Sequence, residues 1–326
     1  MTDTWQPYTT SNMLRQRARL LATIRRFFLE RDVLEVETPL LCQTTGTDPQ
    51  LAFFASQYHD GSSSQTRYLQ TSPEFAMKRL LAAGSGSIYQ ICKAFRNGEN
   101  GQYHNPEFTL LEWYRVGFDM HELMDDVVDL LSLLLDGSIL QTGVERIAYR
   151  ELFERVTGLD ALVFCRSSYR TYANAQGLVD ADRLCGDDHA RWLDFLFSHC
   201  LQPAMAGQPI CLVHGFPAVQ SSLARLDADD PRIAQRFEVI VHGIELGNGF
   251  CELTDADEQA ARFEREMAYR RNHGLPVVNS DSRLIAALRA GLPNCSGIAI
   301  GLDRLLMLAT HSSSIESTLA FPFQRA

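Results

Sequence analysis

Residues 95–108, FRNGENGQYHNPEF, form a polar segment rich in Gly and Asn between two apolar runs, SIYQICKAF and FTLLEWY. In an extended strand, successive side chains point to opposite faces. The positions that share one face of each run are Gln90, Cys92, Ala94 and Arg96 before the loop and Phe108, Leu110, Glu112 and Tyr114 after it. An arginine at a strand end can bind a phosphate through its planar guanidinium. The pattern indicates a hairpin that lines a polar pocket, although a surface hairpin with an ordinary salt bridge has the same features.

A second cluster of chemical groups lies in IELGNGFCEL, where Glu245 and Glu252 frame Gly-Asn-Gly within an apolar run. Carboxylates are hard oxygen ligands that suit Mg²⁺. The two acids have opposite parity, so a regular strand would point them to opposite faces. A bulge at Gly247 or Gly249 would bring both acids to one side. A hairpin turn at Asn248-Gly249 would instead place them on separate strands, and the sequence leaves both alternatives open.

The third cluster is GIAIGLDRLLML, residues 297–308. Gly297 and Gly301 allow the backbone to approach a ligand closely, and Asp303 and Arg304 open the helix that follows. A helix N-terminus favours negative charge, so an arginine there suits an anion, although a plain strand–helix junction has the same pattern. Arginines for phosphate, carboxylates for Mg²⁺ and an aromatic ring for a base are together the groups that phosphoryl or adenylyl transfer needs.

A further glycine-rich stretch, GSGS at residues 84–87, resembles a nucleotide-binding loop, but Tyr89 stands where a third glycine would be needed. The chain also has no GxxxxGK motif. We therefore predict a turn at GSGS, and a nucleotide site that is neither of the Rossmann nor of the P-loop type.

The first predicted helix carries six arginines between Arg15 and Arg31, a pattern that also occurs in basic nucleic-acid-binding helices. Its apolar residues at helical spacing are Leu14, Ala18, Leu21, Ile24 and Phe28. We favour an amphipathic helix whose outer face is rich in arginine.

The remaining pattern predicts strands and helices around one sheet, with a Ser- and Gln-rich loop over 51–71. The predicted strands lie at 33–41, 210–213, 237–253 and 296–301, and the predicted helices at 75–84, 120–135, 149–158, 187–201, 255–274 and 302–310. With no internal repeat and no long linker, we expect an α+β fold with an antiparallel sheet.

Composition narrows the function further. The chain has 326 residues, 45% of them hydrophobic, and a formal net charge of −10, which argues against binding a large area of nucleic-acid phosphate. The eight cysteines have no metal-ligand spacing, and their scatter is typical of reduced thiols. The N-terminus does not resemble a signal peptide, and the run DLLSLLLDG is too short to span a bilayer. These features predict a soluble cytoplasmic protein.

Taken together, the motifs resemble those of the class II aminoacyl-tRNA synthetases, specifically the lysyl branch. The resemblance covers nearly the whole chain: RRFFLERDVLEVETPLL is similar to motif 1, FRNGENGQYHNPEFTLLEWY to motif 2 and GIAIGLDRLLML to motif 3, with GIELGNGFCEL as the lysine-type segment. It implies one catalytic domain over residues 1–326, with an antiparallel sheet flanked by helices, a helical insertion around 119–205 and a homodimer formed through motif 1.

Lysyl-tRNA synthetases carry an N-terminal OB-fold that reads the anticodon, whereas motif 1 begins here near residue 25. The chain thus resembles the stand-alone paralogs that attach (R)-β-lysine to a lysine side chain of translation elongation factor P, and tRNA is an unfavoured acceptor. A truncated synthetase that uses L-lysine and a catalytically inert regulatory paralog are the alternatives.

The resemblance implies ATP and Mg²⁺ as cofactors and a role for each matching position. Arg96 and Arg304 would be catalytic and would hold the α- and γ-phosphates. The remaining ATP-binding positions would be Asn97, Gly98, Asn105, Phe108, Glu245, Leu246 and Gly301. The amino-acid pocket would use Ser72, Pro73, Glu74, Gln90, Glu112, Tyr114, Asn248, Glu252 and Ala299. Glu245 and Glu252 would hold the metal.

The chain departs from the family pattern at three of these positions. Lysyl-tRNA synthetases usually have glutamate at Gln90 and glycine at Ala299, and both changes fit a substrate whose amino group has moved by one carbon. Repacking of the core would explain either change alone. Motif 2 usually has glutamate at Gly98, and here the acid follows as Glu99, so the contact with the adenine amino group falls to Glu99 or to the backbone.

Overall fold

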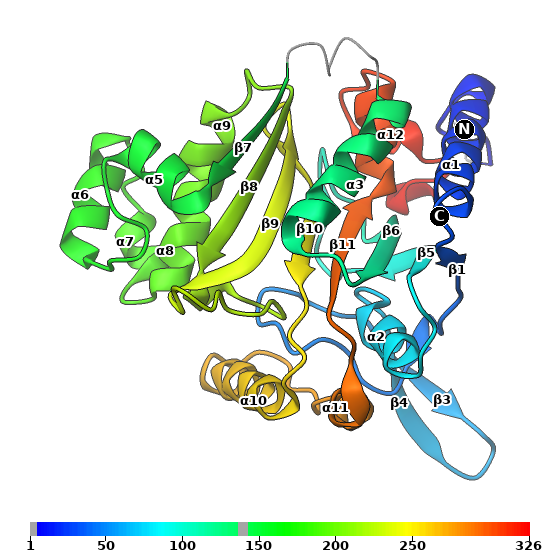
Figure 1. Cartoon of the computed structure of the whole chain (residues 1–326). Coiled ribbons are helices and arrows are strands. Elements are labelled where there is room, and N and C mark those ends of the chain that lie inside the picture. The colour runs from blue at the N-terminus through cyan, green and yellow to red at the C-terminus, as the bar shows by residue number, and fades with distance from the viewer. Residues whose placement is uncertain (1–4, 136–142) are drawn as a thin grey trace. The chain divides into compact units, whose positions relative to one another are not determined.

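The structure, a computed structural model, describes residues 5–135 and 143–326. The chain divides into two compact units (Figure 1). Unit 1 contains Met1–Phe118, Asp129–Leu135 and Thr254–Ala326, and unit 2 contains Asp119–Val128 and Asp136–Leu253. Helix α3, Met120–Leu134, contributes residues to both units. The prediction of one catalytic domain over residues 1–326 stays a prediction.

Unit 1 contains most of the predicted motif segments. Its helices are α1 (Ser11–Leu29), α2 (Glu74–Ala82), α10 (Ala256–Asn272), α11 (Ser282–Gly291) and α12 (Leu302–Ala309). Its strands are β1 (Leu34–Glu35), β2 (Leu41–Cys42), β3 (Ala55–His59), β4 (Ser64–Leu69), β5 (Ile88–Phe95), β6 (Glu107–Val116) and β11 (Cys295–Gly301). Short 3-10 turns follow at Ile315–Thr318 and Phe323–Arg325.

The strands of unit 1 follow the order β1-β5-β6-β11. The pairs β5–β6 and β6–β11 are antiparallel, and only the two-residue strand β1 runs parallel to its neighbour. A smaller antiparallel group has the order β2-β4-β3. The antiparallel pairing with surrounding helices confirms the predicted α+β class.

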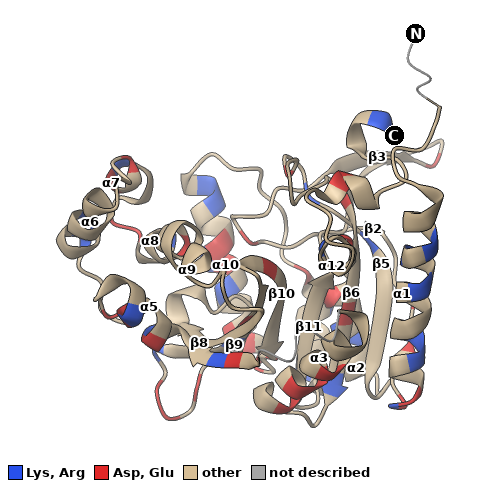
Figure 2. Cartoon of the chain, turned by 90° about the horizontal axis from the view of Figure 1, so that it is seen from above, with Lys and Arg blue, Asp and Glu red and all other residues tan. Residues whose placement is uncertain are grey.

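Helix α1 is amphipathic, as predicted, but its buried face differs in detail. The buried residues are Leu20, Ile24, Phe27 and Phe28. Leu14, which was assigned to the apolar stripe, is 41% exposed, and Ala18 is exposed as well, so that part of the prediction was wrong. Phe28 stacks on Tyr89 of β5 with ring centroids 4.3 Å apart, which explains why the first helix packs through its C-terminal half. Figure 2 shows basic residues along the helix.

Two predictions for the N-terminal region were wrong. The run at 33–41 is not one strand, because only β1 and β2 form at its ends and Pro39 lies between them. The segment 51–71 is not a plain loop, because β3 and β4 pair as an antiparallel hairpin around Asp60. Asp60 accepts hydrogen bonds from the backbone N–H groups of Ser62 and Ser63 at 3.0 and 2.7 Å, and this closes the turn.

Unit 2 combines helices with a second run of strands. Its helices are α5 (Tyr149–Thr157), α6 (Arg166–Ala175), α7 (Ala181–Cys185), α8 (His189–Leu196), a π-helical turn at Phe197–Leu201, α9 (Gln202–Ala204) and a 3-10 turn at Ala218–Gln220. Its strands are β7 (Val144–Ala148), β8 (Ile210–Pro217), β9 (Ile233–Val241) and β10 (Ile244–Cys251).

The strands of unit 2 follow the order β10-β9-β8-β7, of which only β7–β8 is parallel. Tyr149, Phe153, Trp192 and Phe197 are buried in a core that includes residues of β8 and β9. The sequence did not predict β7, and residues 136–142, which belong to the predicted insertion around 119–205, lie outside the described residues. Within the described part of the chain, no helix is both long and apolar enough to cross a membrane.

Candidate active site

The predicted hairpin around residues 96–106 is present, and its register fixes the shared face. Gln90 lies opposite Glu112 in the β5–β6 pair, and Glu112 lies opposite Ala299 in the β6–β11 pair. Directly opposed residues of neighbouring strands point to the same face. Three predicted pocket residues therefore form one row across three strands of unit 1, which we call the pocket row: Gln90, Glu112 and Ala299.

Glu112 is the charged centre of the pocket row and is only 2% exposed. Its Oε1 accepts a hydrogen bond from the Tyr114 hydroxyl at 2.7 Å, and its Oε2 accepts one from the Ser72 hydroxyl at 2.7 Å. Burial, followed by the negative charge of Glu74, raises the pKa of Glu112 to about 7. Two neutral donors thus hold this buried carboxyl group, the buried Lys78 ammonium only partly offsets its desolvation, and an incoming ammonium would favour its ionised form.

The residues before α2 bring Ser72, Pro73 and Glu74 to this group. Ser72 Oγ accepts the backbone N–H of Glu74 at 3.1 Å, so one hydroxyl both opens the helix and donates to Glu112. The Glu74 carboxylate pairs with the ammonium of Lys78, one turn along the helix, at 2.7 Å. Lys78 is almost completely buried, and the sequence analysis did not single it out.

Gln90 is also buried, and its orientation is set from outside the pocket row. The Thr38 hydroxyl donates to Gln90 Oε1 at 3.0 Å. This bond assigns the oxygen of the amide to Thr38, so the amide nitrogen is the end of Gln90 that presents donors elsewhere. A neutral donor at this position differs from the carboxylate that lysyl-tRNA synthetases usually have there.

Arg96 lies where β5 ends and the loop begins. Its backbone N–H donates to Pro106 O at 2.9 Å, and its guanidinium lies over the Phe108 ring, 5.1 Å from the ring centroid. Within the residues that the structure describes, Arg96 Nε is buried and has no hydrogen-bond partner. Because a buried N–H donor without an acceptor is costly, this atom fits an anionic ligand such as a phosphate oxygen.

The loop of residues 96–106, which we call the arginine loop, connects Arg96 to Arg304 through side chains. Gly98 has φ +82°, a conformation that favours glycine over the usual glutamate. The acid that follows, Glu99, lies 3.7 Å from Arg96 Nη1 and 4.0 Å from His104 Nε2. Arg304, at the start of α12, donates from Nε to Tyr103 O at 2.9 Å, and its Nη2 lies 2.6 Å from His104 Nε2. The predicted phosphate arginines therefore belong to one polar cluster.

Two further residues hold the strand that carries Phe108. Asn105 donates to Glu107 O at 2.6 Å and accepts the backbone N–H of Phe323 at 3.0 Å, so its amide is engaged by the chain itself. Asp303, buried beside Arg304, accepts the backbone N–H of Thr109 at 2.7 Å and pairs with Arg17 of α1. The sequence predicted that Asp303 lies at a helix start. It could not predict the hydrogen bond to Thr109, the residue after Phe108, because the two residues are 194 positions apart in the chain.

In unit 2, the register of β9 and β10 decides between the two alternatives for Glu245 and Glu252. The turn lies at His242-Gly243, and a bulge falls between Glu245 and Gly247. The hairpin turn at Asn248-Gly249 was therefore wrong, and the bulge was correct. Leu246 is the extra, buried residue, and from Asn248 onward the alternation returns to the face of Glu245. Glu252 thus shares that face.

The sequence analysis missed Glu238, which lies opposite Asn248 on β9. Arg236 donates to Glu238 at 2.6 Å and to Asn248 Oδ1 at 3.1 Å, and its guanidinium lies over the Phe216 ring. Burial, followed by the charge of Glu245, nevertheless raises the pKa of Glu238 to about 8. The signal that could have found this residue is an acid in the middle of the apolar run FEVIV.

Glu245 and Glu252 lie on one face of unit 2, and carboxylates so arranged are oxygen ligands that fit Mg²⁺. Among the described residues, no three His, Cys, Asp or Glu side chains gather as a metal cluster. Mg²⁺ is commonly held by one or two carboxylates together with substrate phosphates, so such a cluster is not required.

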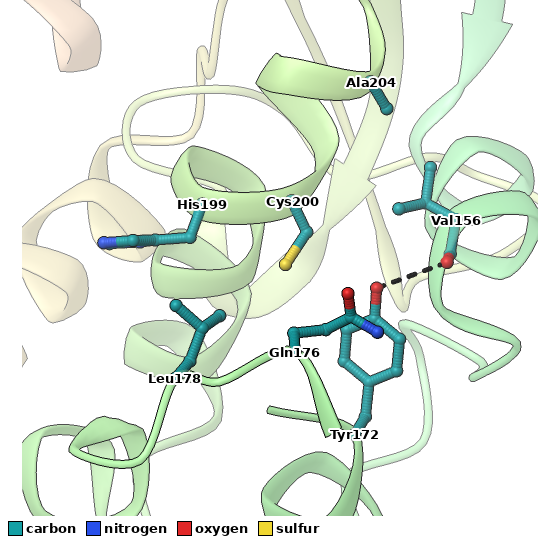
Figure 3. A pocket seen from close by; sticks show the side chains of 7 residues that line it. All are labelled: Val156, Tyr172, Gln176, Leu178, His199, Cys200 and Ala204. Atoms are coloured by element: carbon teal, nitrogen blue, oxygen red, sulfur yellow. Dashed lines mark hydrogen bonds between the residues drawn. The ribbon is translucent and has the colours of Figure 1, made fainter. Parts of the chain in front are cut away.

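Unit 2 also contains a cavity of about 390 Å³, lined by Val156, Tyr172, Gln176, Leu178, His199, Cys200 and Ala204 (Figure 3). The Tyr172 hydroxyl donates to Val156 O at 3.3 Å across it. None of the residues predicted for ATP or amino-acid binding lines this cavity.

Comparison with known proteins identifies the family of the chain over its whole length. Residues 3–325 match the family of class II tRNA synthetases (D, K and N). The elongation factor P–(R)-β-lysine ligase of Vibrio vulnificus is 48% identical over 322 residues, which cover 98% of this chain and 98% of that protein. The proteins of the same name from Vibrio cholerae and Pectobacterium carotovorum are 48% and 45% identical and cover 99% and 100% of this chain, and 98% and 99% of their own lengths. With its pocket row, its arginine loop and these matches, the chain belongs to the class II tRNA synthetase family.

Proposed function

We propose that this chain is an ATP-dependent ligase that activates (R)-β-lysine as an acyl-adenylate and transfers it to a lysine side chain of elongation factor P. The relatives named above, which match over essentially full length, support the amino acid and the acceptor. The observation that carries the chemistry is the presence in unit 1 of the pocket row, with its buried Glu112 carboxyl group, beside a loop in which Arg96 keeps a buried donor for an anion.

In the activation step, a carboxylate oxygen of the amino acid attacks the α-phosphorus of ATP. The bond from that phosphorus to the bridging oxygen breaks, so that an acyl-adenylate and pyrophosphate form. Arg96 stabilises the charge that builds on the α-phosphate, Arg304 binds the γ-phosphate and Phe108 stacks on adenine. Asn97, Gly98, Asn105 and Gly301 supply further contacts to ATP. Preorganised charge of this kind commonly supplies the largest catalytic term.

In the amino-acid pocket of unit 1, Glu112 and Tyr114 bind the side-chain ammonium. Ser72, Pro73 and Glu74 shape the wall of the pocket. The Gln90 amide and the Ala299 methyl group replace the carboxylate and the open space that an α-ammonium would use. The pocket row therefore prefers an amino acid whose amino group lies one carbon further from the carboxyl group.

In the transfer step, the amine of the acceptor lysine attacks the carbonyl carbon of the adenylate. An amide bond forms, AMP leaves with the electrons of the broken C–O bond, and the amine loses a proton to solvent. We assign no general base, because a deprotonated amine held in line with the carbonyl is sufficient. Glu245 and Glu252 would hold Mg²⁺, which when bound offsets the charge of the ATP phosphates.

We also propose that the enzyme acts in the cytoplasm, where its proposed acceptor takes part in translation, and the resemblance of residues 25–41 to motif 1 makes a homodimer the expected assembly. The acidic net charge of −10 disfavours tRNA as the acceptor.

The decisive experiment is ATP–pyrophosphate exchange by the purified protein with (R)-β-lysine, with L-lysine and without an amino acid. Exchange that is strongest with (R)-β-lysine supports the ligase. Exchange only with L-lysine would favour a truncated synthetase. Absence of exchange with both, in folded protein, would favour an inert regulatory paralog and would point to Gly98 as its cause.

A further inference from the structure

A buried arginine lies outside the residues that contact substrate in the proposed reaction. Arg270, in the last turn of α10, is 1% exposed. Its guanidinium donates four hydrogen bonds, all to backbone carbonyl oxygens: Nε to Thr47 at 2.8 Å, Nη1 to Pro276 at 2.9 Å, and Nη2 to Asp48 at 2.6 Å and to Leu51 at 2.7 Å. Other arginines of the described chain, such as Arg150 and Arg232, bind carboxylates, whereas Arg270 binds only backbone carbonyls and so holds a segment of backbone.

The segment that Arg270 holds, residues 47–52, is hydrogen-bonded to the predicted ATP loop. Ala52 O, one residue beyond the Leu51 carbonyl, accepts the backbone N–H of Asn97 at 3.0 Å. Asn97 follows Arg96, the residue assigned to the α-phosphate. The Arg270 guanidinium also lies over the Phe53 ring, 5.4 Å from its centroid, so it contacts the segment on both sides of Ala52.

A second group on the same helix fixes the start of this segment. Glu266, one turn before Arg270, accepts a hydrogen bond from the Thr47 hydroxyl, and Thr47 is buried. Since Thr47 O also accepts a hydrogen bond from Arg270 Nε, the side chain and the backbone carbonyl of Thr47 are both bound to α10. The segment has no strand or helix of its own between β2 and β3, and these side-chain bonds take the place of regular backbone pairing.

We propose that Arg270 is a positioning residue for adenylation: it fixes residues 47–52, which through the Ala52 carbonyl hold the backbone of Asn97 and so set the place of the Arg96 guanidinium. This inference rests on the proposed function, because it is the ATP loop that is positioned. Lysine cannot replace Arg270, because a single ammonium cannot present planar, diverging donors to three carbonyls of one segment at once.

The test compares Arg270→Lys with Arg262→Lys, the same change at another buried arginine of α10, whose Nε donates to Glu258 of its own helix at 2.9 Å. Since a displacement of about 1 Å at reacting groups can cost about 100-fold in rate, we expect Arg270→Lys to lower kcat for pyrophosphate exchange by about 10- to 100-fold. KM for ATP rises, and KM for the amino acid stays within about twofold, because the Glu112 contacts do not involve this segment. Arg262→Lys leaves the ratio of the two KM values unchanged.

A second readout does not need activity. Amide hydrogen exchange of the peptide around Asn97 should be faster in Arg270→Lys than in the wild type and in Arg262→Lys, because the Ala52 acceptor is no longer fixed. If Arg270→Lys does not fold, Leu51→Gly replaces it, because this change loosens the segment without altering the buried charge. It should likewise speed amide hydrogen exchange around Asn97 and lower kcat.

Folded Arg270→Lys with wild-type kinetics and unchanged Asn97 exchange would overturn the proposal, as would equal effects on both KM values. If the wild-type protein itself adenylates no amino acid, the proposed function is wrong, whereas the hydrogen-exchange comparison still decides whether Arg270 holds the loop.

Discussion

The pocket row and the arginine loop both include residues of the β5–β6 hairpin, yet they are organised in different ways. Glu112 is fixed by strand register and by two hydroxyl donors, and its place follows from regular pairing with Gln90 and Ala299. Arg96 follows the last residue of its strand, and the loop beyond it is held by long-range side-chain contacts, such as Arg304 to Tyr103 O. The comparison teaches that the strands fix amino-acid recognition, while the phosphate chemistry depends on cross-links that no single element supplies.

The largest effect is expected at the loop. Arg96→Ala removes a preorganised donor whose Nε is buried without a partner among the described residues. By analogy with the loss of one such donor, adenylation should slow by at least about 100-fold. Pyrophosphate exchange measures this directly, and the amino-acid KM serves as the control. Near-normal exchange would remove Arg96 from the mechanism and would break the division between loop and row.

At the pocket row the expected loss is in binding. Glu112→Gln keeps the shape of the side chain and removes the charge that faces an ammonium. A hydrogen bond to a charged group contributes about 1.5–3 kcal/mol, so KM for the amino acid should rise about 10- to 100-fold while KM for ATP stays constant. The matched variant Glu107→Gln, an exposed acid on the same strand, should leave both constants unchanged. A rise in KM for ATP alone would contradict the assignment of the row to the amino acid.

The pH dependence of stability separates Glu112 from ordinary surface acids. Its pKa of about 7 in the folded chain lies above the ordinary value of 4.5, so the folded state binds the proton more tightly than the unfolded state. This contribution is full below pH 4.5 and is lost as the pH rises to 7. Relative to Glu112→Gln, the free energy of unfolding of the wild type should therefore decline by on the order of 2 kcal/mol across that window. Urea unfolding at several pH values measures the difference, and parallel curves for the two proteins would show that Glu112 ionises without penalty.

The smallest expected effect concerns the substrate selectivity of the pocket row. Ala299→Gly removes one methyl group opposite Glu112. Since one methyl group in a pocket contributes about 1–3 kcal/mol to discrimination, the preference for (R)-β-lysine over L-lysine should fall by about tenfold. Pyrophosphate exchange with both amino acids gives the ratio. An unchanged ratio would assign specificity to Gln90 or to residues outside the row.

The same contrast explains what the sequence could predict. Period-2 alternation grouped Gln90 with Arg96 on one face of the first strand and Glu112 with Tyr114 on one face of the second, because that grouping follows from local pattern alone. The register of the two strands shows that Gln90 and Glu112 lie opposite each other. The bulge in β10 was one of two open alternatives, because Gly-Asn-Gly suits both a bulge and a turn, and the pairing of Glu245 with Ile240 decides it.

Contacts between distant segments could not be predicted. The bond from Asp303 to Thr109 and those from Arg270 to residues 47–51 join parts of the chain far apart in sequence. The hairpin at 55–69 was missed for a different reason: its residues are polar and mostly exposed, so no apolar alternation marks it.

The hydroxyl donors around Glu112 have a consequence for the heat of binding. With a pKa of about 7, part of the Glu112 population carries a proton at neutral pH before any ligand arrives. A cationic amino acid favours the ionised carboxylate, so its binding releases a fraction of a proton to the solvent. The enthalpy that a calorimeter records should therefore change with the ionisation enthalpy of the buffer, and substrate capture by this pocket is in effect an exchange of one small cation for another.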